Sequence, residues 1–266
     1  YRPLNLEDMF FRYGVRINPD LLLDGNSVLI PVITGMNGNS PVYRPGAWYY
    51  SPLLLPRRIH PVTTGLMPVR GDYANSIDTV GGNDGLRKTV LLATSQYSAA
   101  MKTPCPVTLS VTGEKMTPEK FNRKYIPVAV AVEGGFKSLF QYRNMPGVVN
   151  TSFKPESGYN RMIFIADGDI IRNKVRGVGE NAVAVPLGYD EYADKVYGNR
   201  DFLLNCVNWL CDDEGWMQLR GRNLSLYLLD KTRLKAERRR WELFNLLLPL
   251  VVVAALGGLF MVFRRK

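Results

Sequence analysis

Two aspartates and one asparagine are the residues of this sequence best placed to do chemistry. Asp167, Asp169 and Asn173 follow a short apolar segment, 161–166, that has the composition of a buried strand. At the carboxyl end of a parallel strand, such residues lie where α/β proteins bind ligands, and their oxygens suit Mg²⁺ or Ca²⁺. In the alternative interpretation, which we favour, the carboxylates accept hydrogen bonds from backbone N–H groups and hold the turn after the strand.

Residues that would support covalent catalysis are scarce. His60 is the single histidine, so a Ser–His or Cys–His pair would have to use it. Pro61 follows it, and we interpret His60 as a turn residue that bonds to the backbone. No cysteine or serine lies in a Gly-x-Cys-x-Gly or Gly-x-Ser-x-Gly elbow. We expect the cysteines to be small buried apolar residues; they are Cys105, Cys206 and Cys211.

Phosphate-binding loops are also missing from the sequence. The glycine pairs at 81–82 and 134–135 are not followed by the Gly-Lys-Ser/Thr of a Walker motif. ATP hydrolysis by that route is therefore excluded for this chain. The sequence predicts no catalytic residue, no metal site and no cofactor.

An aromatic cluster offers a second candidate binding region. Trp48, Tyr49 and Tyr50 follow a stretch rich in turn-forming residues, 35–46, which we expect to be a loop. Loops of this kind often hold binding residues, whereas aromatic side chains beside prolines usually pack. A sugar- or peptidoglycan-binding module that uses these three aromatic residues is a weaker alternative.

The C-terminal region has the pattern of a membrane anchor. The 21 residues of 243–263 carry no charge and would span roughly 31 Å as a helix. Basic residues lie on both sides, as is typical of membrane-spanning helices. We therefore predict a transmembrane helix over 242–263, after a basic juxtamembrane linker over 226–241 and before a basic tail over 264–266.

The net charge of +10 is concentrated near this anchor. Residues 226–266 hold nine basic and three acidic residues, a net of +6, whereas 1–225 hold 25 basic and 21 acidic residues, a net of +4. Such a segment is attracted to anionic membrane lipid. No basic stripe interleaved with aromatic residues runs through 1–225, so we do not expect a nucleic-acid partner.

The remaining pattern predicts one α/β domain over 1–225 with a mainly parallel sheet flanked by helices. Short apolar strands alternate with helices, which is typical of such folds. Strands are expected at 28–34, 89–94, 126–133, 161–166 and 219–229, and helices at 4–13, 118–125 and 201–211. Gly14 would end the first helix and Asn199 would cap the last. The chain begins at Tyr1, so we expect further elements upstream.

Several stretches resemble the gliding-motility-associated ABC transporter auxiliary family, GldG, in its C-terminal part. The similar stretches are 6–24, 48–55, 60–66, 89–98, 126–136, 165–173 and 198–216. The family pattern around the aspartates often reads Gly-Asp-Ser-Asp-Phe, and this chain has Ala166 and Ile170 at the outer positions. The resemblance implies an extracytoplasmic domain similar to the glutamine-amidotransferase-like (flavodoxin-like) fold, without its catalytic residues. It also implies an ABC permease and a separate ATPase as partners.

Together these observations predict a non-catalytic, membrane-anchored accessory subunit of an ABC transport complex of the gliding-motility type. The anchor would lie in the inner membrane with the large domain in the periplasm, although the positive-inside count alone favours the cytoplasm. The alternative is a membrane-anchored metal-dependent or amidase-like hydrolase that uses Asp167 and Asp169. The candidate ligand- or partner-binding residues are Trp48, Tyr49, Tyr50, Asp167, Asp169 and Asn173.

Overall fold

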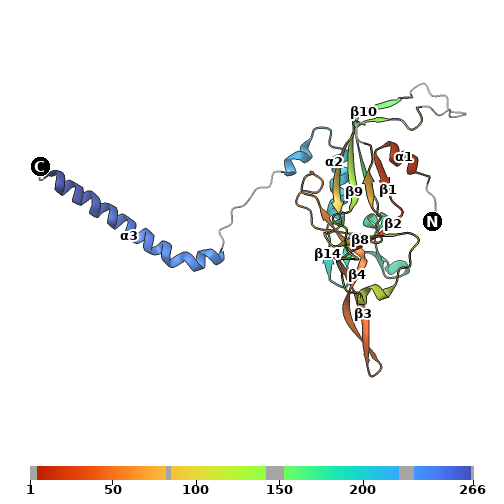
Figure 1. Cartoon of the computed structure of the whole chain (residues 1–266), viewed down its shortest axis with the longest axis horizontal. Coiled ribbons are helices and arrows are strands. Elements are labelled where there is room, and N and C mark those ends of the chain that lie inside the picture. The colour runs from red at the N-terminus through yellow and green to blue at the C-terminus, as the bar shows by residue number, and fades with distance from the viewer. Residues whose placement is uncertain (1–4, 82–84, 142–152, 222–230, 265–266) are drawn as a thin grey trace. The chain divides into compact units, whose positions relative to one another are not determined.

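The computed structural model describes residues 5–81, 85–141, 153–221 and 231–264. The chain forms two compact units, Tyr1–Arg222 and Asn223–Lys266. A six-stranded sheet dominates the first unit (Figure 1). Its strands lie in the order β10 (Glu156–Ile165), β9 (Pro127–Lys137), β7 (Arg87–Ala93), β4 (Ser40–Pro56) and β3 (Ser27–Asn37), with β5 (Val69–Arg70) paired to β4.

Four strand pairs and several short helices surround this sheet. The pairs are β1 (Val15–Ile17) with β6 (Ile77–Thr79), β2 (Asp20–Asp24) with β8 (Ser98–Lys102), β11 (Val175–Arg176) with β12 (Val183–Ala184), and β13 (Tyr189–Asp190) with β14 (Lys195–Val196). The α-helices of this unit are α1 (Glu7–Arg12) and α2 (Asn199–Leu210). The short 3₁₀-helices are η1 (Leu109–Gly113), η2 (Gly168–Ile171), η3 (Gly179–Asn181) and η4 (Trp216–Gly221).

The predicted parallel sheet of a flavodoxin-like α/β domain is wrong. Every strand pair in the described part of the chain is antiparallel. Parallel neighbours need a long crossover connection, usually a helix. The helix expected at 118–125 is only a turn, in which the N–H of Phe121 donates to the carbonyl of Thr117 at 3.0 Å. No described α-helix joins two neighbouring strands of the sheet.

A parallel sheet was predicted because the strands are apolar on both sides, and they are so because both faces of the sheet are buried. One face of β9 presents Ala129 and Ala131 to a core that includes Phe202 of α2. The other face presents Val130 to a core that is packed by Phe10 of α1. Figure 1 shows α1 and α2 on either side of this part of the sheet. Continuous apolar runs are the usual mark of parallel strands, but here helices cover both faces of an antiparallel sheet.

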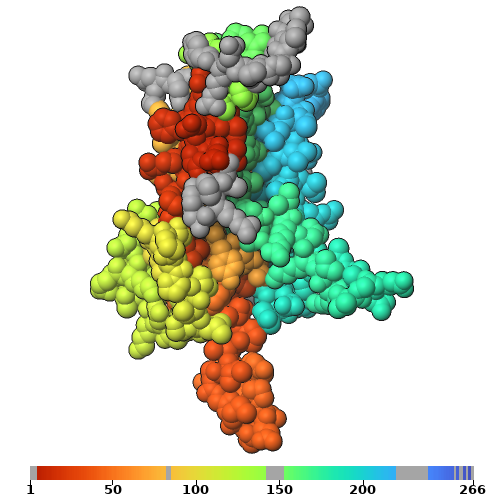
Figure 2. Space-filling view, turned by 90° about the vertical axis from the view of Figure 1, so that its right-hand side faces the viewer, coloured from red at the N-terminus to blue at the C-terminus, as the bar shows by residue number. Residues whose placement is uncertain are grey.

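A long hairpin replaces the loop expected at 35–46. β3 continues to Asn37 and pairs with Ser40, so Gly38 and Asn39 form a two-residue turn. Gly38 has φ of 60°, the conformation that the first turn position of a type II′ hairpin requires. The hairpin projects from the body of the unit (Figure 2). Residues that read as turn formers therefore belong to paired strands.

The second unit contains one helix, α3 (Lys231–Arg264). Within the part of the chain that the structure describes, no helix combines the length and the apolar character needed to cross a bilayer. This finding contradicts the transmembrane helix predicted over 242–263 and the inner-membrane location that depended on it. The helix begins in the charged residues of the expected linker, includes the whole apolar stretch and contains Pro249. Of the strand expected at 219–229, residues 219–221 lie in η4 and the rest lie outside the described residues.

Candidate functional site

Asp167 lies two positions after the end of β10 and holds the turn into η2. Its Oδ1 accepts a 2.8 Å hydrogen bond from the N–H of Asp169, and its Oδ2 accepts a 2.9 Å bond from the N–H of Asp72. The residue is buried, and this burial raises the pKa of its carboxyl to about 6, against the lowering effect of the two backbone hydrogen bonds. Both oxygens are therefore engaged by the backbone, which is the turn-holding role that we favoured.

The other two residues of this predicted site point elsewhere. The carboxylate of Asp169 accepts a 3.3 Å bond from the guanidinium of Arg172. The amide of Asn173 donates to the carbonyl of Val185 at 3.4 Å. Among the described residues, no group of three His, Cys, Asp or Glu side chains is arranged to hold a metal ion. The three residues of this patch do not converge on one point.

The three aromatic residues separate because they lie on a strand, not in a loop. Alternation along β4 sends Tyr49 to the opposite face from its neighbours, where it packs edge-on against Phe121 at 5.0 Å. Tyr50 is also buried, with 3% of its surface exposed, and contacts the ring of Trp48 at 5.0 Å. Trp48 itself is half-buried. Tyr49 and Tyr50 are therefore packing residues, and Trp48 alone remains available to a ligand.

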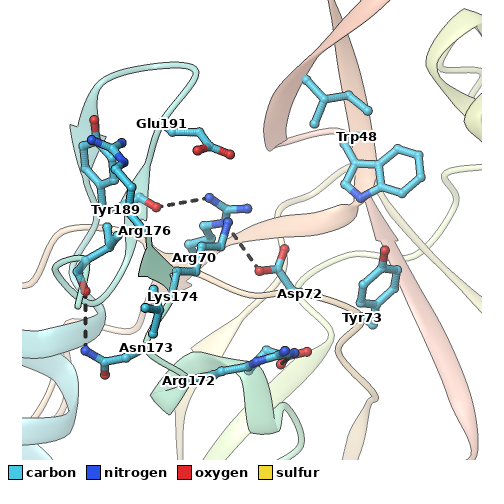
Figure 3. A pocket seen from close by; sticks show the side chains of 14 residues that line it. Trp48, Arg70, Asp72, Tyr73, Arg172, Asn173, Lys174, Arg176, Tyr189 and Glu191 are labelled. Carbon is cyan, nitrogen blue, oxygen red and sulfur yellow. Dashed lines mark hydrogen bonds and ion pairs between the residues drawn. The ribbon is translucent and has the colours of Figure 1, made fainter. Parts of the chain in front are cut away.

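A cavity of about 710 Å³ brings three of the six predicted residues together (Figure 3). It lies between β4, β5 and the segment that follows η2. Its lining residues are Ile30, Trp48, Arg70, Asp72, Tyr73, Asp169, Arg172, Asn173, Lys174, Val175, Arg176, Val185, Tyr189 and Glu191. Trp48, Asp169 and Asn173 were predicted as site residues, whereas Tyr49, Tyr50 and Asp167 do not line it.

Arg70 occupies the middle of this cavity (Figure 3). Its Nε lies 3.5 Å from Oδ2 of Asp72, an ion pair whose geometry does not make a hydrogen bond. Its Nη1 donates to the carbonyl of Tyr189 at 3.4 Å. Asp72 is held in turn by the hydroxyl of Ser51, which donates to its Oδ1. The side chain of Arg70 is 13% exposed, so the guanidinium is a largely desolvated cation with donors to spare.

Asn199, the first residue of α2, fixes the backbone that carries Arg70. Its Oδ1 accepts from the N–H of Arg70 at 2.9 Å, and its Nδ2 donates to the carbonyls of Arg70 at 2.8 Å and Ile170 at 3.3 Å. The expected capping role is wrong, because Gly198 occupies the N-cap position. Asn199 is buried and instead joins α2, β5 and η2.

Sequence reasoning missed the basic residues of the cavity. Arg172, Lys174 and Arg176 occupy alternate positions of an extended segment, and alternate residues of extended chain share a side. The alternate spacing of these basic residues could have indicated from the sequence that they share one side of the segment. Arg70 carried no signal, because only the fold brings it within reach of Tyr189.

The fold and the cavity define an antiparallel β domain with a polar, partly aromatic ligand-sized pocket. Residues 2–206 match the family described as an ABC-type uncharacterized transport system, and the chain belongs to this family. It is an auxiliary component of an ABC-type transport system and works with other components of that system. No curated protein and no solved structure gives a significant match to the chain.

Proposed function

We propose that this chain is a non-catalytic accessory subunit that binds a small ligand in the cavity around Arg70 and associates with an ABC permease. A separate ATPase chain would supply the energy. The observation that carries the proposal is the cavity itself, because it combines a desolvated cation with an aromatic wall and is of the size that small-molecule sites have. The family membership supplies the transport context.

The residues that the sequence offered for bond cleavage are engaged in packing and in backbone hydrogen bonds. The imidazole of His60 is buried against Trp209, at 4.8 Å between ring centroids, and its Nδ1 accepts from the N–H of Val62. Both carboxylate oxygens of Asp167 are occupied by backbone donors. Asp169, the other carboxylate of the hydrolase alternative, is paired with Arg172. These contacts leave the hydrolase alternative without support from the three residues.

The β3–β4 hairpin is the part of the unit that we propose for contact with the transporter. Ile33 and Tyr43 are directly opposite each other on the two strands, and 59% and 57% of their surfaces are exposed. Met36, near the turn, is 65% exposed. Exposed apolar side chains on a projecting element are suited to burial against a partner. The gliding-motility type rests on the resemblance of the similar stretches alone, and the contact with membrane lipid stays a prediction.

Affinity purification of the tagged full-length chain from its native cells in mild detergent tests this proposal. We expect the permease and the ATPase to be recovered with it and to be absent from a purification with an unrelated tagged protein. Recovery of no transporter component, or turnover of a hydrolase substrate that is lost on substitution of Asp167, would contradict it.

A further inference from the structure

The charges of the cavity around Arg70 give it a small positive excess. Four cations line it, at Arg70, Arg172, Lys174 and Arg176, against three carboxylates, at Asp72, Asp169 and Glu191, so the net is 4 − 3 = +1. Asp72 and Asp169 already face Arg70 and Arg172 in ion pairs. The cations outside these pairs are Lys174 and Arg176. A ligand with one or two carboxylates complements the two cations outside the ion pairs, whereas a phosphate-dense ligand would be repelled by the carboxylates of the lining.

An unsatisfied donor points to the position of the negative group. The Nε of Arg70 is buried and has no hydrogen-bond partner among the described residues. The nearest acceptor, Oδ2 of Asp72 at 3.5 Å, makes no hydrogen bond with it. Because buried donors are almost always paired, this position suits an acceptor from a ligand. A carboxylate matches the fork of a guanidinium group with two parallel hydrogen bonds. Arg70 is therefore the group that would bind a carboxylate of the ligand.

Aromatic rings lie on two facing walls of the cavity. Trp48 and Tyr73 lie on one wall, across from Tyr189 and Arg176 (Figure 3). Tyr73 is 47% exposed, and the guanidinium of Arg176 lies 5.9 Å from the centroid of the Tyr189 ring. Aromatic faces pack against the apolar face of a sugar ring, and their polar edges tolerate its hydroxyls.

Polar side chains complete a set suited to hydroxyl groups. Glu191 and Asn173 at the edge of the cavity offer oxygen acceptors, and Lys174 offers an ammonium donor. A sugar hydroxyl donates one hydrogen bond and accepts others, so it needs both kinds of partner. A purely apolar ligand would leave these groups unpaired, at a cost in binding free energy.

We infer that the cavity binds an acidic oligosaccharide, a short chain of sugar rings that carry carboxylate groups. The carboxylate would bind Arg70, with Lys174 and Arg176 as flanking cations, and a ring would stack on Trp48. This inference rests on the proposed function, because it names the ligand class of the same cavity. It assigns no reaction to the site.

Titration calorimetry of the full-length chain with digalacturonate tests the inference. Two comparison ligands separate the contributions, since lactose is a neutral disaccharide and sulfate is an anion without a sugar ring. We expect digalacturonate to bind at least roughly tenfold more tightly than either, as one charge-assisted hydrogen bond would give. Equal binding of all three, tighter binding of sulfate, or no binding of digalacturonate would overturn it.

Variants locate the binding in the cavity. The double substitution Lys174→Gln with Arg176→Gln should weaken digalacturonate binding roughly tenfold. It should leave lactose binding unchanged, because glutamine keeps a hydrogen-bond donor and removes only the charge of these exposed side chains. Trp48→Leu should weaken both sugars. Lys102→Gln is the matched control, since Lys102 is exposed on β8 and does not line the cavity. An equal loss with Lys102→Gln would count against the assignment.

The outcome also separates the ligand class from the proposed function. The purification of transporter components is repeated with the wild-type chain and with the double variant. Failure of digalacturonate to bind, with permease recovery intact, rejects the acidic sugar alone. Failure to recover the permease rejects the accessory role whatever the calorimetry shows.

Discussion

The carboxylate of Asp167 accepts a hydrogen bond from the backbone N–H of Asp72, 95 positions earlier in the chain, at 2.9 Å. Because Asp72 contacts Arg70, this bond connects the end of β10 to the centre of the cavity. The bond is made by a group whose pKa lies near 6. Protonation of Asp167 thus takes place beside the proposed ligand site.

Asp167→Asn should change how stability depends on pH. Burial raises the pKa of Asp167 from 3.8 to about 6, so between these values the folded state binds more protons than the unfolded state. Its contribution to the free energy of unfolding therefore falls as pH rises, by up to about 3 kcal/mol above pH 6. The free energy of unfolding of the variant, minus that of the wild type, should therefore be larger at pH 7 than at pH 4.5. Urea unfolding at both pH values measures this, and an equal difference at the two would refute it.

His60→Phe should remove a loss of stability that the wild type shows as the pH falls. Burial lowers the pKa of His60 from 6.5 to about 4, so the unfolded state binds more protons in this range. The wild type should lose roughly 2 kcal/mol of stability between pH 6.5 and 4, after allowance for solvent screening. The variant keeps a ring against Trp209 and should lack this loss. Thermal unfolding across pH 4 to 7 is the measurement, and an unchanged slope would contradict the prediction.

Asn199→Ala should destabilise the fold by about 3 kcal/mol. The side chain makes three hydrogen bonds to the backbone of Arg70 and Ile170, and its removal leaves buried groups without partners. Asn160→Ala is the control, because the side chain of Asn160 is exposed on β10 and accepts a hydrogen bond from the adjacent N–H of Arg161. Denaturant titration should show a change within about 0.5 kcal/mol for the control. Similar losses for both variants would argue against the joining role of Asn199.

Ile33→Ser combined with Tyr43→Ser should weaken partner recovery without affecting the fold. Both side chains are more than half exposed, so their substitution should change stability by less than about 0.5 kcal/mol. Co-purification of the permease should fall sharply if the hairpin contacts it. Leu204→Ser on α2 is a matched control, since Leu204 is 50% exposed outside the hairpin. Retention of the permease by the hairpin variant would exclude this surface.

The sequence predicted local segments better than their pairing. The strand expected at 28–34 lies within β3, and Gly14, with φ of 82°, follows the first helix as the glycine indicated. Pairing direction failed because a strand covered on both faces has the same composition in a parallel and an antiparallel sheet. The spacing of Gly and Pro in 35–46 also could not distinguish a loop from a hairpin whose strands are mostly exposed.

The site was predictable only in part, for a related reason. Asp169 and Asn173 were found from their place after a strand, and Trp48 from its aromatic neighbours. Strand alternation then sent Tyr49 away from the cavity, which a loop assignment could not anticipate. Arg70 reaches the cavity through Asn199, a contact between residues 129 positions apart. Such long-range contacts leave no local pattern.

β4 is one uninterrupted strand from Ser40 near the hairpin turn to Pro56 in the core. Tyr43 and Trp48 lie five positions apart on it, roughly 17 Å of extended backbone. A partner that binds the end of the hairpin therefore contacts the same strand that carries Trp48 in the cavity wall. Partner binding and ligand binding would then be coupled through the backbone of β4, without a chain of side-chain contacts between them.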